Sequence, residues 1–237
     1  MNLTQTLRQI LPLRYCGAVI VAAGNASRMG GIDKVMAPIG GEPMLVRTVR
    51  AFQESEVIRE IVIVTRQDLL EQVRLLCAGF DKVKTVVEGG ADRTASVAAG
   101  LNALSKRVEL VAIHDGARPL ISQQVIERTV RAGNTYSAAA PAIPVKDTIK
   151  TVQGGVVVET PDRSKLQAVQ TPQVFDLDLL RGAMKYAEQK KLSVTDDCSV
   201  MEAMGMSVKI VEGDERNIKV TTPLDLKIAH AFLEEEA

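Results

Sequence analysis

Cationic side chains stand in and beside a loop of small residues near the start of the chain. The loop, VAAGNASRMGG at residues 21–31, follows the apolar run 17–20 and contains Arg28, and Lys34 lies six residues further on. Backbone N–H groups of such a loop can approach an anion closely, and the two cations would neutralise its charge. The pattern indicates an anion-binding loop. A tight strand-to-helix connection with two solvated cations is the alternative.

Two standard phosphate-binding patterns are missing from this loop. A dinucleotide fingerprint requires G-x-G-x-x-G, and of its three glycines the loop supplies only Gly24. A Walker A loop requires a Gly-Lys pair, but the residue five positions after Gly24 is Met29. The loop therefore argues against a dinucleotide-dependent dehydrogenase and indicates a phosphate site of another kind.

An acidic residue follows a second apolar run, in VAIHDGARP at residues 111–119. A carboxylate directly after a buried strand lies where α/β sheets bind ligands, so Asp115 could hold Mg²⁺ or a ribose hydroxyl. Arg118 could bind a phosphate with its planar fork. An Asp–Arg pair that only fastens the loop is the alternative. We expect His114 to pack or to hydrogen-bond at the strand end rather than to catalyse.

Two further segments could contribute polar groups. In GGADRTASV at residues 89–97, two glycines would let the backbone approach a flat ligand, and Ser96 could bond the edge of a base. A helix that starts after a turn explains this segment equally well. Lys219 in NIKVT is flanked by apolar residues, which indicates a lysine directed at a ligand. A solvated lysine explains the pattern about equally well.

Short apolar runs alternate with segments of helical periodicity. Strands are expected at 17–22, 61–64, 84–87, 110–114, 138–144 and 208–211. Helices are expected at 44–52, 67–77, 93–104, 125–132, 177–188, 197–204 and 223–236. In the second helix, Leu69, Leu70, Val73 and Leu76 are expected to face inward. This order predicts an α/β fold: a doubly wound, mostly parallel, Rossmann-like sheet in a single domain, 1–237.

The alternation is interrupted at about residues 144–165. Two β-rich runs, 148–152 and 156–159, flank the pair Gly154-Gly155, which is a hairpin signal. A hairpin inserted there would project from the body as an arm, and a two-stranded arm is only marginally stable alone. We therefore expect the arm to pack on a second subunit, with an unsupported insertion as the alternative.

Composition narrows the function classes. Lys+Arg and Asp+Glu balance at 29 each, which argues against a nucleic-acid or anionic-membrane partner. Three cysteines and two histidines fit no metal-ligand spacing. No secretory signal is recognisable, and no run reaches the ~18 apolar residues of a membrane span. We expect a cytoplasmic protein with buried thiols.

The motifs, taken in order, resemble one family. AAG-x-x-x-RMG, Lys34, GG-x-x-R-x-x-SV, HDGARP, PVKDT, TPQ, TDD and NIKVT are similar to those of the 2-C-methyl-D-erythritol 4-phosphate cytidylyltransferases of the non-mevalonate isoprenoid route, from about residue 16 to 230. The resemblance implies transfer of CMP from CTP to this polyol phosphate, release of pyrophosphate, Mg²⁺, and a homodimer whose arms reach the partner's site. The sequence departs from the family pattern at two positions. Ala26 stands where glycine is common, and Ala91 stands where an acidic residue is common.

The resemblance also implies roles for individual residues. Arg28, Lys34 and Lys219 would be catalytic, neutralising the phosphates of CTP and the charge of the in-line transition state. CTP would be bound by Ala22, Ala23, Gly24, Gly90, Ser96, Asp115 and Gly116. The sugar phosphate would be bound by Asp115, Arg118, Thr171, Thr195 and Lys219, with Thr148 and Arg163 from the partner's arm. Asp115 would be the metal ligand. Positioning and positive charge suffice for such a transfer, without a strong general base.

Three alternatives stay open at this point. Ribitol 5-phosphate cytidylyltransferases share most of these motifs. The motifs therefore do not distinguish ribitol 5-phosphate from 2-C-methyl-D-erythritol 4-phosphate as the acceptor. Another base is possible, because the base would be recognised mostly through backbone groups. A non-catalytic nucleotide-binding regulatory module is the third alternative. It predicts the loss of one of Arg28, Lys34, Asp115 or Lys219, and all four are present.

Overall fold

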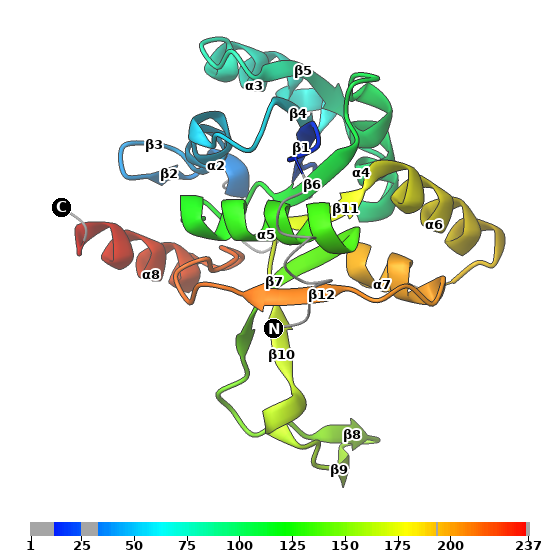
Figure 1. Cartoon of the computed structure of the whole chain (residues 1–237). Helices are drawn as coiled ribbons and strands as arrows, with labels where there is room; N and C mark the ends of the chain where they lie inside the picture. Colours follow the sequence, from blue (N-terminus) through cyan, green and yellow to red (C-terminus); the bar gives the residue numbers. More distant parts are fainter. Residues whose placement is uncertain (1–11, 25–32, 193, 236–237) are drawn as a thin grey trace.

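A computed structural model describes residues 12–24, 33–192 and 194–235. An eight-stranded sheet forms its centre (Figure 1). One half is parallel, in the order β6-β1-β4-β5, and consists of β1 (Cys16–Ala22), β4 (Glu60–Thr65), β5 (Val83–Glu88) and β6 (Leu110–Asp115). Every residue of β4 and β6 is buried. Strands that are buried along their whole length are typical of a sheet whose two faces are both covered by helices.

The other half of the sheet is mixed. β11 (Gln173–Asp176) lies antiparallel between β6 and β7 (Ala138–Pro144), and β10 (Gln167–Val169) pairs antiparallel with the later residues of β7, on the same side as β11. The late strand β12 (Lys209–Glu212) pairs with β7 in parallel. The predicted α/β class and largely parallel sheet are confirmed. The antiparallel insertion of β11 and β10 was not predicted.

Helices cover both faces and create two cores. Residues of alternate parity on β1 point to opposite faces: Ala18 and Ile20 join the core beneath α2, α3 and α5, and Val19 joins the core beneath α4, α6 and α7. The first set is α2 (Met44–Glu54), α3 (Leu70–Cys77) and α5 (Gln123–Tyr136). The second is α4 (Arg93–Ala103), α6 (Leu177–Gln189) and α7 (Asp197–Ala203).

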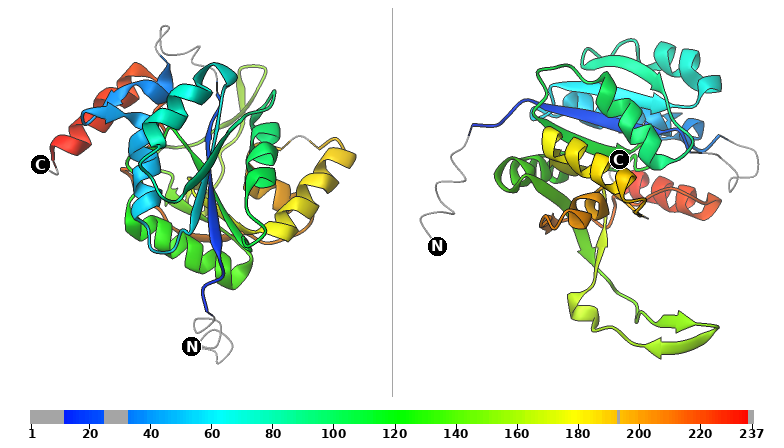
Figure 2. Two further views of the ribbon diagram at one scale, coloured as in Figure 1. Left: turned by 90° about the horizontal axis from the view of Figure 1, so that it is seen from above. Right: turned by 90° about the vertical axis from the view of Figure 1, so that its right-hand side faces the viewer.

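A smaller third core joins the C-terminal helix to a short ribbon. Figure 2 shows α8 (Pro223–Glu234) beside the β2 (Pro38–Ile39) and β3 (Glu42–Pro43) ribbon. Ile39 and Ala229 are buried in this core. The predicted start of α8 is confirmed, since Thr222 caps the helix by accepting a hydrogen bond from the N–H of Asp225.

One predicted helix face needs correction. The segment 67–77 opens with a 3-10 turn, η2 (Gln67–Leu69), and the α-helix begins at Leu70. Leu69 and Val73 are buried as expected, but Leu76 is 39% exposed and Cys77 is buried in its place. The buried face of this segment is therefore formed by Leu69, Val73 and Cys77, which are spaced by four residues, and Leu70 packs beside them.

The hairpin arm projects from the body, as Figures 1 and 2 show. It consists of β8 (Thr151–Gln153) and β9 (Val156–Glu159), and it returns through η3 (Arg163–Lys165) to β10. Gly154 and Gly155 join the two strands with φ of +57° and +80°. A two-residue turn with positive φ at both positions favours glycine and matches the twist of a hairpin. The predicted arm is confirmed, although its first strand starts at Thr151.

Candidate functional site

The carboxyl ends of β1 and β6 meet at one edge of the sheet, where Val21 pairs with Asp115. A cavity of about 230 Å³ opens there. It is lined by residues from segments far apart in the sequence, among them Ala22, Ala23, Gly24, Lys34, Gly90, Arg93, Ser96, Asp115 and Lys219. The structure thus brings together most of the side chains and backbone segments that the sequence assigned to one nucleotide site, at the position expected for open α/β sheets.

Close packing shapes the wall formed by the two glycines after β5. A Cβ on Gly89 would lie 2.4 Å from the Cβ of Ala23, and one on Gly90 would lie 2.3 Å from the Cβ of Ala95. The hydroxyl of Ser96 donates to the carbonyl of Asp92 (2.8 Å) and accepts from the N–H of Gly90 (3.1 Å). Ser96 was predicted to bond a base edge. Its hydroxyl fixes the glycine backbone that lines the cavity, and its contact with a base edge stays a prediction.

Asp115 is the carboxylate at the centre of the site, and three cations surround it. Its Oδ2 lies 2.9 Å from Lys219 Nζ and 3.5 Å from Arg118 Nε, and its Oδ1 lies 3.8 Å from Arg93 Nε. Burial alone would raise the pKa of Asp115, but Lys219, Arg93 and Arg118 outweigh burial and lower the pKa to about 2. Asp115 is therefore ionised at neutral pH.

Arg93 connects this carboxylate to α7. Its Nη2 donates to Oδ2 of the buried Asp197 at 2.6 Å. Burial raises the pKa of Asp197, and Arg93 opposes that effect. The side chain of Gln173 accepts hydrogen bonds from the N–H groups of Asp197 and Cys198 and donates to Asp196. The TPQ and TDD segments are thereby joined. Sequence reasoning did not give Arg93, Gln173 or Asp197 individual roles.

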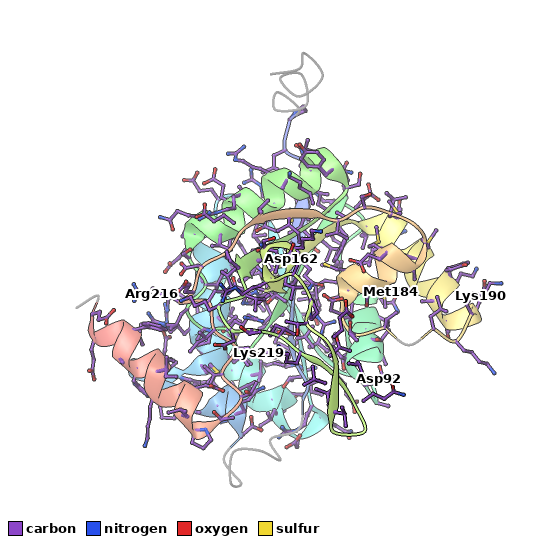
Figure 3. The ribbon with its side chains drawn as sticks, turned by 90° about the horizontal axis from the view of Figure 1, so that it is seen from below. Asp92, Asp162, Met184, Lys190, Arg216 and Lys219 are labelled. Atoms are coloured by element: carbon purple, nitrogen blue, oxygen red, sulfur yellow. The ribbon has the colours of Figure 1, made fainter. Side chains whose placement is uncertain are left out.

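The loop that carries Lys219 is fastened to the end of β6. Arg118 Nη1 donates to the carbonyl of Asn217 at 2.6 Å, and Val220 N–H donates to Ala117 O at 2.8 Å. Asn217 is fully buried and donates to the carbonyl of Thr171 at 2.8 Å. In Figure 3, Lys219 lies in the middle of the molecule, between Arg216 on the side of α8 and Asp92 at the start of α4. These bonds hold the Lys219 ammonium group against Asp115.

A buried histidine supports the site from behind. His114 Nε2 lies 3.2 Å from the carbonyl of Arg118, which can only accept, so Nε2 carries the proton. Nδ1 then accepts from the hydroxyl of Thr171 at 2.9 Å, and that hydroxyl accepts from the N–H of Asp115 at 3.2 Å. Burial lowers the pKa of His114 to about 3, so the ring is neutral. The predicted hydrogen-bonding role of His114 is confirmed, and the hydroxyl of Thr171 is engaged within the protein.

The remaining predicted residues lie elsewhere. Arg28 lies outside the described residues. Thr148 and Arg163 are exposed on the arm, which extends away from the body of its own chain (Figure 2), and Arg163 Nη1 donates to the carbonyl of Lys146. Thr195 is exposed just before α7, and its N–H donates to Ser199. Gly116 packs directly behind the cavity wall, because a Cβ there would lie 3.0 Å from the Cβ of Ala22.

Two findings concern the described residues as a whole. Within residues 12–24, 33–192 and 194–235, no group of three or more histidine, cysteine, aspartate or glutamate side chains is arranged to hold a metal ion. No helix in the same part of the chain is long and apolar enough to cross a membrane. All three cysteines are buried free thiols, as expected.

Comparisons with known proteins agree with this geometry. The family model described as 2-C-methyl-D-erythritol 4-phosphate cytidylyltransferase matches residues 16–235. The enzyme of that name from Caldanaerobacter subterraneus is 44% identical over 221 residues, which are 91% of this chain and 97% of the relative. The one from Symbiobacterium thermophilum is 46% identical over 221 residues, 92% of this chain and 93% of the relative.

Solved structures are similar as well. 4-Diphosphocytidyl-2C-methyl-D-erythritol synthase from Anaerococcus prevotii superposes with a TM-score of 0.85 at 30% identity, covering 99% of this chain and 100% of the other. The cytidylyltransferase from Thermus thermophilus superposes with a TM-score of 0.76 at 32% identity, covering 93% of this chain and 99% of the other.

Proposed function

The chain belongs to the 2-C-methyl-D-erythritol 4-phosphate cytidylyltransferase family, and we propose that its 230 Å³ cavity is where CMP passes from CTP to that polyol phosphate. The observation that carries this assignment is the convergence of Lys34, Lys219 and Asp115 on a cavity whose other walls are the backbone after β1 and β5. A flat base can lie against such backbone walls, while the cations face its phosphates.

Each cation has a role in the transfer. An oxygen of the acceptor phosphate attacks the α-phosphorus of CTP, the bond to the pyrophosphate oxygen breaks, and pyrophosphate leaves with the electron pair. Lys34 and Lys219, together with Arg28, neutralise the charge that builds on the in-line transition state. The nucleophile is already anionic, so no general base is required. This agrees with a neutral His114 that is fully buried.

The acceptor is bound beside the triphosphate. Arg118, Thr195 and Lys219 bind the sugar phosphate. The hydroxyl of Thr171 accepts a hydrogen bond from the N–H of Asp115 and so helps to position that residue. Thr148 and Arg163 come from the arm of a second subunit. The exposed valines of the arm support a homodimer, because Val152, Val156, Val157 and Val158 are between 53% and 66% exposed in the single chain.

Mg²⁺ fits this pocket mainly through the substrate. The ion is commonly held by one or two carboxylates together with substrate phosphates. Asp115 is the buried carboxylate among the residues that line the pocket, and its close cations leave most of the ligand positions to the triphosphate. When bound, the ion supplies further neutralisation of the phosphate charge. The free thiols support a reducing, cytoplasmic location.

Pyrophosphate release tests the proposal. The protein is incubated with CTP, Mg²⁺ and either 2-C-methyl-D-erythritol 4-phosphate or ribitol 5-phosphate, and kcat/KM is compared for the two acceptors and for CTP against UTP, ATP and GTP. Lys34→Ala should lower kcat/KM by about 10²–10³-fold, and Lys227→Ala, an exposed lysine on α8, is the matched control. No release with either acceptor contradicts the transferase function, and preference for ribitol 5-phosphate contradicts the assigned acceptor.

A further inference from the structure

Arg66 belongs to none of the motifs described above, yet it stands at the edge of the sheet that carries the cavity. It follows Thr65, the last residue of β4, which pairs with Ala22 of β1. Its guanidinium holds Asp68 bidentately, with Nε at 3.0 Å and Nη2 at 2.9 Å from the two carboxylate oxygens. The same Nη2 donates to Oδ2 of Asp33. Arg66 therefore links the end of β4 to the residue that precedes Lys34.

Asp33 fixes the backbone of the turn that carries Lys34. Its Oδ1 accepts from the N–H of Val35 at 3.1 Å, and its carbonyl accepts from the N–H of Met36 at 3.1 Å. The turn, η1 (Lys34–Met36), is a single 3-10 turn and has little stability of its own. Val35, which is buried in the core at 3% exposure, and the Asp33 cap both help to hold the turn in place.

The Arg66–Asp33 pair is also better shielded than ordinary surface pairs. The side chains of Arg66 and Asp33 are 22% and 19% exposed, compared with 62% and 52% for Arg131 and Glu127 on α5. Less screening strengthens the interaction and its geometric effect.

We propose that Arg66 is a positioning residue: through Asp33 it fixes the η1 turn and so places Lys34 in the nucleotide cavity. The proposal rests on the role of Lys34 given under Proposed function. Arg66 is not among the described residues that line the cavity, so we assign its effect on turnover to the Asp33 cap and to the turn that carries Lys34. Its removal should therefore weaken the handling of CTP and leave the affinity for the acceptor phosphate unchanged.

Steady-state kinetics on the full chain test this directly. Arg66→Met should lower kcat/KM for CTP on the order of 10-fold, because small displacements of a catalytic group are costly, with KM for the polyol phosphate unchanged. In a Lys34→Ala background, the same substitution should change kcat/KM by less than about 2-fold, since residues that act through one another are not additive. Adding Asp33→Asn to Arg66→Met should restore part of the activity, because asparagine keeps an acceptor for the N–H of Val35 without an unpaired carboxylate beside Lys34. Arg131→Met is the matched control, and urea unfolding checks each variant.

The outcomes separate the possible failures. An Arg66→Met enzyme with normal kinetics, or one whose loss is equally large in the Lys34→Ala background, overturns the proposal. Normal kinetics of Lys34→Ala alone refute the role of Lys34 and the proposal with it. Inactivity of the wild type with both acceptors refutes the transferase function itself. If Arg66→Met does not fold, Asp33→Asn replaces it in the double-mutant comparison of kcat/KM with Lys34→Ala. The Asp33→Asn variant is expected to fold, because the asparagine side chain keeps an oxygen acceptor for the N–H of Val35.

Discussion

The neutral histidine of β6 makes stability depend on pH in a way that can be calculated. His114 is fully buried, and its ring packs 4.8 Å from that of Phe52. Both ring nitrogens are used, one donating to the carbonyl of Arg118 and one accepting from Thr171. A proton added to Nδ1 would place a positive charge in the core, and burial opposes that charge more strongly than the neighbouring Asp115 favours it. Folding therefore favours the neutral ring.

The sign and size follow from linkage. Burial lowers the pKa of His114 to about 3 in the folded chain, whereas an unfolded histidine titrates near 6.5. Below about pH 6.5 the unfolded chain binds a proton that the folded chain does not, so stability is present above that pH and is lost as the pH falls. Between about pH 7 and pH 5 the loss amounts to roughly 2 kcal/mol, at about 1.4 kcal/mol per pH unit.

Urea unfolding at these two pH values measures the loss. The chain has no tryptophan, so far-UV circular dichroism is the appropriate signal. Between pH 7 and pH 5, the free energy of unfolding of the wild type should fall by roughly 2 kcal/mol more than that of His114→Gln. The control is His230→Gln, which changes an exposed histidine on α8 and should behave as the wild type does. Asp115, with a pKa of about 2, stays ionised throughout and does not contribute. An equal loss in wild type and His114→Gln would refute the reasoning.

Further substitutions test the site, the core and the arm. Lys219→Met removes the cation 2.9 Å from Asp115. It should raise the pKa of that carboxyl and lower kcat by about 10²–10³-fold in the pyrophosphate assay. Gly133→Ala on α5 would place a Cβ 2.4 Å from a valine of β11 and should lower the free energy of unfolding by roughly 1–3 kcal/mol. Gly182→Ala on α6 meets no atom within 4 Å and should instead raise it by roughly 0.5–1 kcal/mol. Val157→Asp on the arm should leave circular dichroism unchanged and reduce dimer in light scattering; an unchanged dimer would contradict the proposed arm contact.

The parallel half of the fold was predictable because its signals are local. β1, β4 and β6 each contain a short apolar run, and β1 begins within one residue of its predicted start at 17. β10 and β11 carry no comparable signal, since three or four residues of mixed polarity become strands only through their partners on β6 and β7. Likewise, the residues that α3 buries could not be predicted from helical periodicity alone, because the 3-10 turn η2 precedes the helix and changes its register.

The site was predictable to the level of segments and less so to the level of atoms. Residues that follow parallel strands converge at one sheet edge, which is why Ala22, Gly90 and Asp115 line one cavity. The direction of a hydroxyl is set by tertiary neighbours: that of Ser96 turns to its own glycine loop and that of Thr171 to His114. The Arg93–Asp197 pair joins residues 104 positions apart, a contact that neither spacing nor periodicity reveals.

The arrangement of charges explains what an aspartate does in a site for anions. Asp115 is ionised and in contact with Lys219, with Arg118 and Arg93 close by, and Arg93 is in turn neutralised by Asp197. Without Asp115 the cations would repel one another and spread apart. With it they stand ordered before substrate arrives, so that phosphate groups meet donors already in position. Since the carboxylate balances only part of the positive charge, the pocket keeps an excess that favours a triphosphate and a sugar phosphate together. We propose that Asp115 contributes chiefly by ordering these cations, and that the substrate phosphates would supply most of the ligands for Mg²⁺.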